Sequence, residues 1–215
     1  MHEKFFQTAR LNMVKNQILP NNVKNKELIE SFSSIQKEIF VPVALHDLTY
    51  SDSEIKICKN RNLMKTFIIA KMFDRCNFEP DDKVLVIGCL TGYSIAILSK
   101  MVNYVVGLDN EKEIIEQACK NIDKLNILNC SLFYKKDLSQ GLSRNAPYDK
   151  IFIEGMVKTI PTQLLKQLKE HGEIFVTIKN QDYVGDFVRA LKIESSFSIE
   201  KYFNTGIKDK VELII

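Results

Sequence analysis

The spacing of apolar residues divides the chain into two parts. In the first eighty residues the apolar positions recur every three or four residues, which predicts helices. We expect these helices over Ala9–Ile18, Asn25–Ser34 and Asn62–Cys76. Between them we expect an extended stub at Phe40–Pro42 and a short strand at Glu54–Cys58. This part is predicted to form a helical cap that packs beside the rest of the chain.

From Asp82 onward, short apolar runs alternate with segments of helical periodicity. A run such as Val84–Ile87 is apolar on both faces, as a parallel strand covered by helices on both sides requires. The expected strands are Val84–Gly88, Tyr104–Leu108, Ser131–Lys135, Lys150–Glu154 and Glu173–Ile178, and the expected helices are Tyr93–Met101, Glu111–Leu125 and Pro161–Leu168. Alternation of this kind is typical of a doubly wound parallel sheet.

The C-terminal tail predicts an addition to one edge of this sheet. We expect a helix at Tyr183–Leu191 and two strands, Ser198–Phe203 and Val211–Ile215, as an antiparallel edge pair. The fold class is therefore α/β: a doubly wound, mostly parallel Rossmann-like sheet with helices on both faces, an N-terminal helical cap and an antiparallel C-terminal edge. A chain of 215 residues, 45% of them hydrophobic, can bury one good core, so residues 1–80 and 81–215 should form one folding unit.

Composition argues against several classes of function. The net charge of +3 comes from 30 basic and 27 acidic residues spread along the chain, so no basic stripe predicts a nucleic-acid surface. Five cysteines without a C-x-x-C motif and three histidines without ligand spacing indicate neither a metal site nor a disulfide framework. No apolar stretch approaches the ~20 residues that span a bilayer, and no secretory signal is present. We therefore expect a cytoplasmic protein without a membrane partner.

The most informative motif is the loop that follows the strand at Val84–Gly88. It reads Gly88-Cys89-Leu90-Thr91-Gly92, and its glycines allow a tight turn and a close approach of a ligand to the backbone. The next strand ends at Asp109, whose carboxylate can accept hydrogen bonds from both hydroxyls of a ribose. Because the loop lacks one glycine and a nearby basic residue, it favours S-adenosylmethionine over a dinucleotide. The alternative is a strand-to-helix turn that uses glycine for its geometry alone.

Further polar residues follow the ends of other predicted strands. Ligands of open α/β sheets bind outside the carboxyl ends of the strands, so Asp137, Leu138 and Glu154 are candidates to join Asp109 in one pocket. Asp137 could accept from an adenine amino group, and Leu138 could cover the face of the ring. Glu154 lies where cofactor and substrate would meet. The alternatives are a solvated loop residue for Asp137 and a structural cap for Glu154.

The order of several motifs resembles the protein-L-isoaspartate O-methyltransferases over residues 9 to about 180. These motifs are Arg10-x-Asn12-Met13-Val14-x-x-Gln17-Ile18, Phe40-Val41-Pro42, Tyr50-x-Asp52, Ala70-x-Met72, Gly88–Tyr93 and Pro147-Tyr148-Asp149. The resemblance implies methyl transfer from S-adenosylmethionine to the free carboxylate of L-isoaspartyl, and possibly D-aspartyl, residues in damaged proteins or peptides. It implies a cofactor site formed by Gly88, Cys89, Leu90, Gly92, Asp109, Asn110, Asp137, Leu138 and Glu154. A carboxylate with a pKa of ~4 is already ionised at neutral pH, so no general base is required.

The chain departs from this family where the acceptor should bind. The family usually carries Thr-Ile-Ser-x-Pro, whereas this chain reads Asn62-Leu63-Met64-Lys65-Thr66, so Met64 stands at the position of the serine. A thioether donates no hydrogen bond, and Thr66 or Arg61 are the candidates to replace the missing donor. In the cofactor loop, Leu90 stands where the family has a glycine, and Val86 replaces an acid. Two alternatives stay open: a methyltransferase with another acceptor, and an inactive module that binds S-adenosylmethionine.

Overall fold

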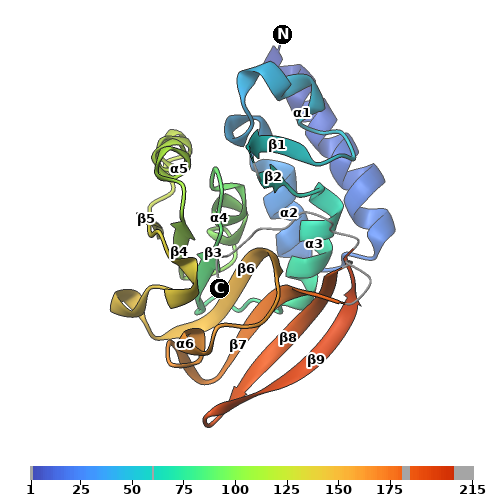
Figure 1. Ribbon diagram of the computed structural model, residues 1–215. Helices are drawn as coiled ribbons and strands as arrows, with labels where there is room; N and C mark the ends of the chain where they lie inside the picture. Colours follow the sequence, from blue (N-terminus) through green and yellow to red (C-terminus); the bar gives the residue numbers. More distant parts are fainter. Residues whose placement is uncertain (1, 60, 181–184, 206–215) are drawn as a thin grey trace.

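The computed structural model describes residues 2–59, 61–180 and 185–205, and its centre is a seven-stranded sheet (Figure 1). The strand order is β5-β4-β3-β6-β7-β8-β9, parallel from β5 to β7 and antiparallel from β7 to β9. The strands are β3 (Lys83–Ile87), β4 (Tyr104–Asp109), β5 (Cys130–Tyr134), β6 (Tyr148–Val157), β7 (Leu168–Lys179), β8 (Gly185–Ile193) and β9 (Ser196–Asn204). The predicted fold class is confirmed.

Helices and short turns connect the parallel strands. They are α4 (Tyr93–Leu98), α5 (Lys112–Lys124), α6 (Thr162–Leu165) and two single 3₁₀ turns, Leu138–Gln140 and Ser143–Asn145. The strand order reverses between β3 and β6, because the chain passes from β3 to β4 and β5 on one side of β3 and then returns to β6 and β7 on the other side. This is the switch point at which open α/β sheets bind their ligands.

The N-terminal elements form the predicted cap on one side of the sheet (Figure 1). They are α1 (His2–Met13), a π-helical turn (Val14–Ile18), α2 (Lys26–Ser34), 3₁₀ turns at Leu19–Asn21, Lys37–Phe40 and Val43–Leu48, a hairpin of β1 (Ile55–Cys58) and β2 (Arg61–Leu63), and α3 (Thr66–Arg75). The hairpin is a separate two-stranded sheet. Within the cap, α3 is linked to the segment that begins α2 by the Asp74 carboxylate, which accepts from the backbone N–H groups of Lys24 and Asn25, at 2.9 Å each.

The two faces of the sheet pack against different cores. Val84 and Val86 point into a core that they share with the cap, α4 and α5. Leu85 and Ile87 point into a second core with α6 and the 3₁₀ turn at Leu138–Gln140. Since side chains alternate along a strand, this explains why β3 is apolar throughout and why its sequence alone predicted helices on both faces.

Several predicted elements differ from the structure. The segment predicted as a helix at Tyr183–Leu191 is strand β8 over its described residues, and β8 and β9 form the antiparallel edge; the predicted strand at Val211–Ile215 lies outside the described residues. Phe187 and Ala190 are three residues apart, which fits a helix, but both are buried in the strand against neighbouring strands and the cores. Long-range pairing with β7 therefore overrides the local pattern.

Other corrections concern the ends of elements. The predicted helix at Asn62–Cys76 begins as strand β2 and becomes helical only at Thr66, and Phe40 belongs to a 3₁₀ turn rather than to an extended stub. The helix predicted at Pro161–Leu168 is limited to Thr162–Leu165, because the chain enters β7 at Leu168.

We propose that the cap and the sheet unfold as one unit, because the buried Phe32 of α2 packs on Tyr93 of α4, with ring centroids 6.1 Å apart. Phe32→Ala should lower the free energy of unfolding of the whole protein by about 3–5 kcal/mol. Phe5→Ala is the matched control: Phe5 is 62% exposed, so its loss should change stability by less than about 0.5 kcal/mol. Denaturant unfolding, followed by circular dichroism and by aromatic fluorescence, measures both. Two separate transitions, with only one affected by Phe32→Ala, would contradict a single unit.

Candidate functional site

The glycine loop lies at the carboxyl end of β3 and turns the chain into α4. Gly88 and Gly92 have φ of +83° and +93°, a region that glycine adopts without strain. Leu90 also has a positive φ of +48°, which is unfavourable for a branched side chain. Its backbone N–H donates to Asp109 at 2.8 Å, which holds the loop in this conformation. The loop is therefore built around the carboxylate at the end of the neighbouring strand.

Asp109 is fully buried at the end of β4. Besides Leu90, the backbone N–H groups of Asn110 and Glu111 donate to its carboxylate, at 2.8 and 3.3 Å. Carboxylates are buried in proteins only when they are paired and hydrogen-bonded. The sequence placed this residue correctly at the end of a strand beside the glycine loop.

Arg61 supplies the charge that pairs with Asp109. One terminal nitrogen, Nη1, lies 2.7 and 2.8 Å from the two carboxylate oxygens of Asp109, and the other, Nη2, donates to the backbone oxygen of Gly88 at 2.6 Å. The Arg61 side chain is only 7% exposed. The guanidinium thus lies against the glycine loop and the strand-end acid, where the sequence predicts the ribose.

Glu154 of β6 completes this group of buried polar residues. Burial raises the pKa of Glu154 to about 7, although the hydroxyl of Ser94, which donates to Glu154 Oε2, and the positive charge of Arg61 both act to lower it. Glu154 Oε1 and Arg61 Nε have no hydrogen-bond partner. We refer to Arg61, Gly88, Leu90, Asp109 and Glu154 as the Asp109 cluster. Cys89 lies beside it, and burial raises the pKa of its thiol well above the usual range.

The remaining predicted cofactor residues are placed less centrally. Asn110 is half-buried and meets the Asp109 cluster through its backbone N–H. Asp137 is exposed, and its carboxylate accepts from the backbone and hydroxyl of Ser139 at 3.0 and 2.6 Å. The hydroxyl of Ser139 is also the main cause that lowers the pKa of Asp137. Leu138 is buried in the second core. Within the described residues, no hydrogen bond or ion pair joins Asp137 or Leu138 to the Asp109 cluster.

The predicted acceptor residues are buried, and each of the polar ones has a partner inside the protein. Met64 packs in the core shared by cap and sheet. The hydroxyl of Thr66 accepts from the Lys37 ammonium group, Nζ, at 2.8 Å. Lys37 itself is fully buried, and burial lowers its pKa to about 7. Sequence reasoning missed Lys37, Ser94 and the contact from Arg61 to Asp109, because none follows a strand end or has a recognisable spacing.

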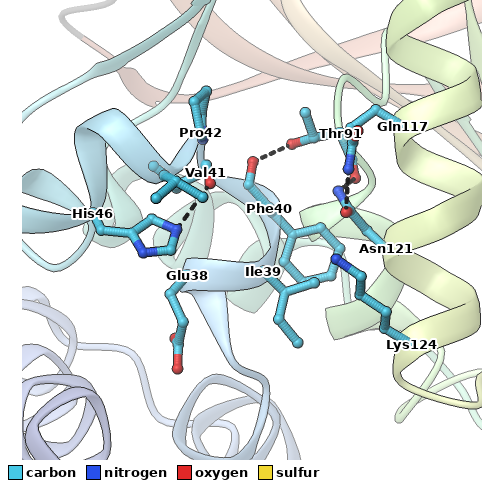
Figure 2. Close-up of a pocket in the computed structure, with 11 residues that line it drawn as sticks. Glu38, Ile39, Phe40, Val41, Pro42, His46, Thr91, Gln117, Asn121 and Lys124 are labelled. Carbon is cyan, nitrogen blue, oxygen red and sulfur yellow. Dashed lines mark hydrogen bonds between the residues drawn. The ribbon is translucent and has the colours of Figure 1, made fainter. Parts of the chain in front are cut away.

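A separate cavity of about 440 Å³ lies between the cap and α5 (Figure 2). Its polar walls are occupied by internal hydrogen bonds: Thr91 donates to Phe40 at 2.7 Å, Asn121 to the Thr91 backbone oxygen at 3.0 Å, and Gln117 to Asn121 at 2.8 Å. These bonds tie the glycine loop to the Phe40-Val41-Pro42 motif and to α5. The cavity is thus a contact region of the cap, and none of the residues that line it belongs to the Asp109 cluster.

A parallel sheet with a glycine loop after one strand and a buried acid after the next defines the class of Rossmann-like α/β proteins that bind nucleoside cofactors. Within that class, residues 9–205 match the family model "Protein-L-isoaspartate(D-aspartate) O-methyltransferase". The chain therefore belongs to the protein-L-isoaspartate(D-aspartate) O-methyltransferase family, which confirms the resemblance carried by its motifs.

Individual relatives agree with this assignment. The chain is 28% identical to the protein-L-isoaspartate O-methyltransferase of Syntrophus aciditrophicus over 209 residues, which cover 97% of this chain and 95% of the relative. A solved protein-L-isoaspartate O-methyltransferase superposes with a TM-score of 0.74 at 22% identity; the match covers 95% of this chain, which spans 64% of that one. A putative enzyme of this kind from Plasmodium falciparum, solved with S-adenosyl-L-homocysteine, gives 0.76 at 16% identity and covers 93% and 99% of the two chains. The two structures establish the shared fold.

The raised pKa of Glu154 predicts how stability depends on pH. Between pH 4.5 and about 7, the folded protein keeps a proton on Glu154 that the unfolded chain has released. The free energy of unfolding should therefore fall as pH rises through this window, by up to roughly 3 kcal/mol from this residue. Glu154→Gln should remove that fall, whereas Glu116→Gln, a change at an exposed residue of α5, should keep it. Denaturant unfolding at several pH values measures the difference, and parallel profiles for wild type and Glu154→Gln would contradict it.

Proposed function

We propose that the protein is an S-adenosylmethionine-dependent methyltransferase that esterifies the free carboxylate of L-isoaspartyl, and possibly D-aspartyl, residues in damaged proteins and peptides. The observation that carries the proposal is the family match over residues 9–205, which includes both the cap and the strand ends. Bound S-adenosylmethionine would supply an electrophilic methyl group on a sulfonium. The ester could then close to a succinimide, which gives the damaged linkage a route back to a normal one.

The Asp109 cluster fits this cofactor in its chemistry. Asp109 offers a strand-end carboxylate suited to a ribose diol, and Gly88 allows a close approach to the backbone. Glu154 Oε1 is a buried acceptor without a partner, which suits a cationic group of the cofactor. Together with Cys89, Leu90, Gly92, Asn110, Asp137 and Leu138, these residues form the proposed cofactor site. The conformation described here needs one change before a ribose can reach Asp109: the Arg61 guanidinium has to move.

The chain's contribution to methyl transfer would consist of placement and exclusion of water. The acceptor carboxylate is ionised at neutral pH, so no residue has to remove a proton from it. Holding two reactants in line can by itself contribute several kcal/mol to lowering the barrier. The cap, whose core is continuous with that of the sheet, supports a role as the cover that keeps bulk water from the reacting atoms.

For the acceptor we propose that the segment around Met64 binds the isoaspartyl carboxylate, with Arg61 and Thr66 as hydrogen-bond donors.

The cysteines of the described residues are free thiols, namely Cys58, Cys76, Cys89, Cys119 and Cys130. Free thiols are typical of the reducing cytoplasm, which supports a function there on isoaspartyl-containing proteins and peptides. Among the described residues, no helix has the length and apolar character to cross a membrane.

The decisive assay is methyl transfer from labelled S-adenosylmethionine to an isoaspartyl peptide, with the matching aspartyl peptide as control. We expect label on the isoaspartyl peptide only, and release of that label in mild base, as a methyl ester requires. Cofactor binding measured by calorimetry on the same sample separates the other outcomes. Binding without transfer to the isoaspartyl peptide would contradict the repair function and favour another acceptor or a non-catalytic module.

The missing serine makes a further prediction about the acceptor site. Met64→Ser should raise kcat/KM for the isoaspartyl peptide at least about tenfold, since a hydrogen bond to a charged group is worth about 1.5–3 kcal/mol. Met64→Ala is the matched control, because it removes the thioether without adding a donor. Steady-state kinetics with the peptide as the varied substrate measures both variants. Equal values for serine and alanine would show that position 64 does not contact the acceptor carboxylate.

A further inference from the structure

We propose that Arg61 is an internal occupant of the ribose position, so that the cofactor binds only when the Arg61 guanidinium leaves Asp109. This inference rests on the proposed function, because it takes Asp109 as the ligand of the ribose. It concerns the regulation of that site: the chain carries its own competitor for the cofactor on the β1–β2 hairpin.

The contacts of Arg61 match those expected of a ribose. A ribose presents two neighbouring hydroxyl donors to a strand-end carboxylate. Arg61 presents N–H donors to both oxygens of Asp109, at 2.7 and 2.8 Å, and to the Gly88 backbone oxygen, at 2.6 Å. A Cβ added to Gly88 would lie 3.1 Å from Arg61 Nη2. The guanidinium thus lies in the space beside Gly88 that a side chain at this position would restrict.

Asp109 has no acceptor capacity left while Arg61 is bound. An ionised carboxylate offers about four lone-pair sites. Two are used by Arg61, one on each oxygen, and the backbone N–H groups of Leu90 and Asn110 use one more on each, both at 2.8 Å; the Glu111 N–H adds a longer contact to Oδ1 at 3.3 Å. A ribose hydroxyl can therefore bind Asp109 only in exchange for Arg61. Binding of the two is mutually exclusive.

The contact is also one that can open. Arg61 lies on β2, which within the described part of the chain pairs with β1 alone, so no hydrogen bond of the seven-stranded sheet described above has to break. Two-stranded hairpins have little stability of their own. Arg61 Nε and Glu154 Oε1 both lack partners, so the closed state leaves two buried polar atoms unsatisfied. The buried Ile55 and Leu63, which pair with each other, hold the hairpin at the end away from Arg61, which limits the change to the arginine and its neighbours.

We call a molecule open when the Arg61 guanidinium has left Asp109. An internal competitor lowers the apparent affinity for the cofactor in proportion to the fraction of open molecules. With an open population of about 1–10%, typical of a minor state, removal of Arg61 should tighten binding about 10- to 100-fold. In the enzyme without cofactor, Arg61 would neutralise the charge of Asp109. A buried Asp109 without a partner would be strongly unfavourable.

The test is calorimetric titration with S-adenosylhomocysteine of the wild type, Arg61→Ala and Lys56→Ala. Lys56 is an exposed cation on β1 of the same hairpin, so its variant removes equal charge without touching Asp109. We expect Arg61→Ala to bind at least about tenfold tighter, and Lys56→Ala to stay within about twofold of the wild type. The proposal would be overturned if Arg61→Ala bound S-adenosylhomocysteine as tightly as the wild type or more weakly. It would also be overturned if neither the wild type nor Arg61→Ala bound the ligand.

A second measurement does not depend on the folding of Arg61→Ala. In the wild type, a dicarbonyl reagent specific for arginine should label Arg61 slowly without ligand and several times faster with saturating S-adenosylhomocysteine, as read by peptide mass spectrometry. Arg75, exposed at the end of α3, is the internal control and should react equally in both states. Equal protection of Arg61 with and without ligand would show that it stays on Asp109, and would overturn the proposal.

The two proposals fail in different ways. If the cofactor binds tighter to Arg61→Ala but no variant methylates the isoaspartyl peptide, the internal competitor stands and the repair function fails. If the wild type methylates the peptide while Arg61→Ala binds the cofactor with unchanged affinity, the repair function stands and the internal competitor fails.

Discussion

The buried ion pair between Arg61 and Asp109 is the interaction on which the arrangement of the site depends. It connects the hairpin of the cap to the carboxyl edge of the sheet, and the same carboxylate holds the glycine loop through Leu90. Removing one partner of such a pair leaves a charge in the interior without compensation, which is strongly unfavourable. The cap, the loop and strand β4 are therefore coupled at a single carboxylate.

This coupling gives a physical account of the chain's departures from its family. Leu90 stands at a position of positive φ where the family has glycine, and its N–H bond to Asp109 offsets the unfavourable backbone conformation. Met64 lies in the apolar core, close in sequence to Arg61. Arg61, three residues before Met64, contacts the carboxylate of Asp109. The proposed competition at Asp109 rests on that contact.

Much of the fold could be predicted from the sequence, because its central strands are apolar on both faces and end in glycine or acid. The runs at β3 and β4, and with them the positions of Gly88 and Asp109, depend on local pattern alone. Strand β8 could not be predicted, since Phe187 and Ala190 fit both a helix and a strand, and its pairing with β7 decides between them. Arg61 was singled out as a donor for the acceptor carboxylate, which stays a prediction; its partner in the structure, Asp109, lies 48 positions away, a relation that no local spacing reveals.

The most direct test of this account is a crystal structure of the full chain with S-adenosylhomocysteine bound. The account predicts that the ribose hydroxyls of the ligand contact the carboxylate of Asp109, that the adenosine lies beside Gly88, and that the Arg61 guanidinium has left both. A structure in which Arg61 still holds Asp109, with the ligand bound elsewhere or absent from the strand ends, would contradict it.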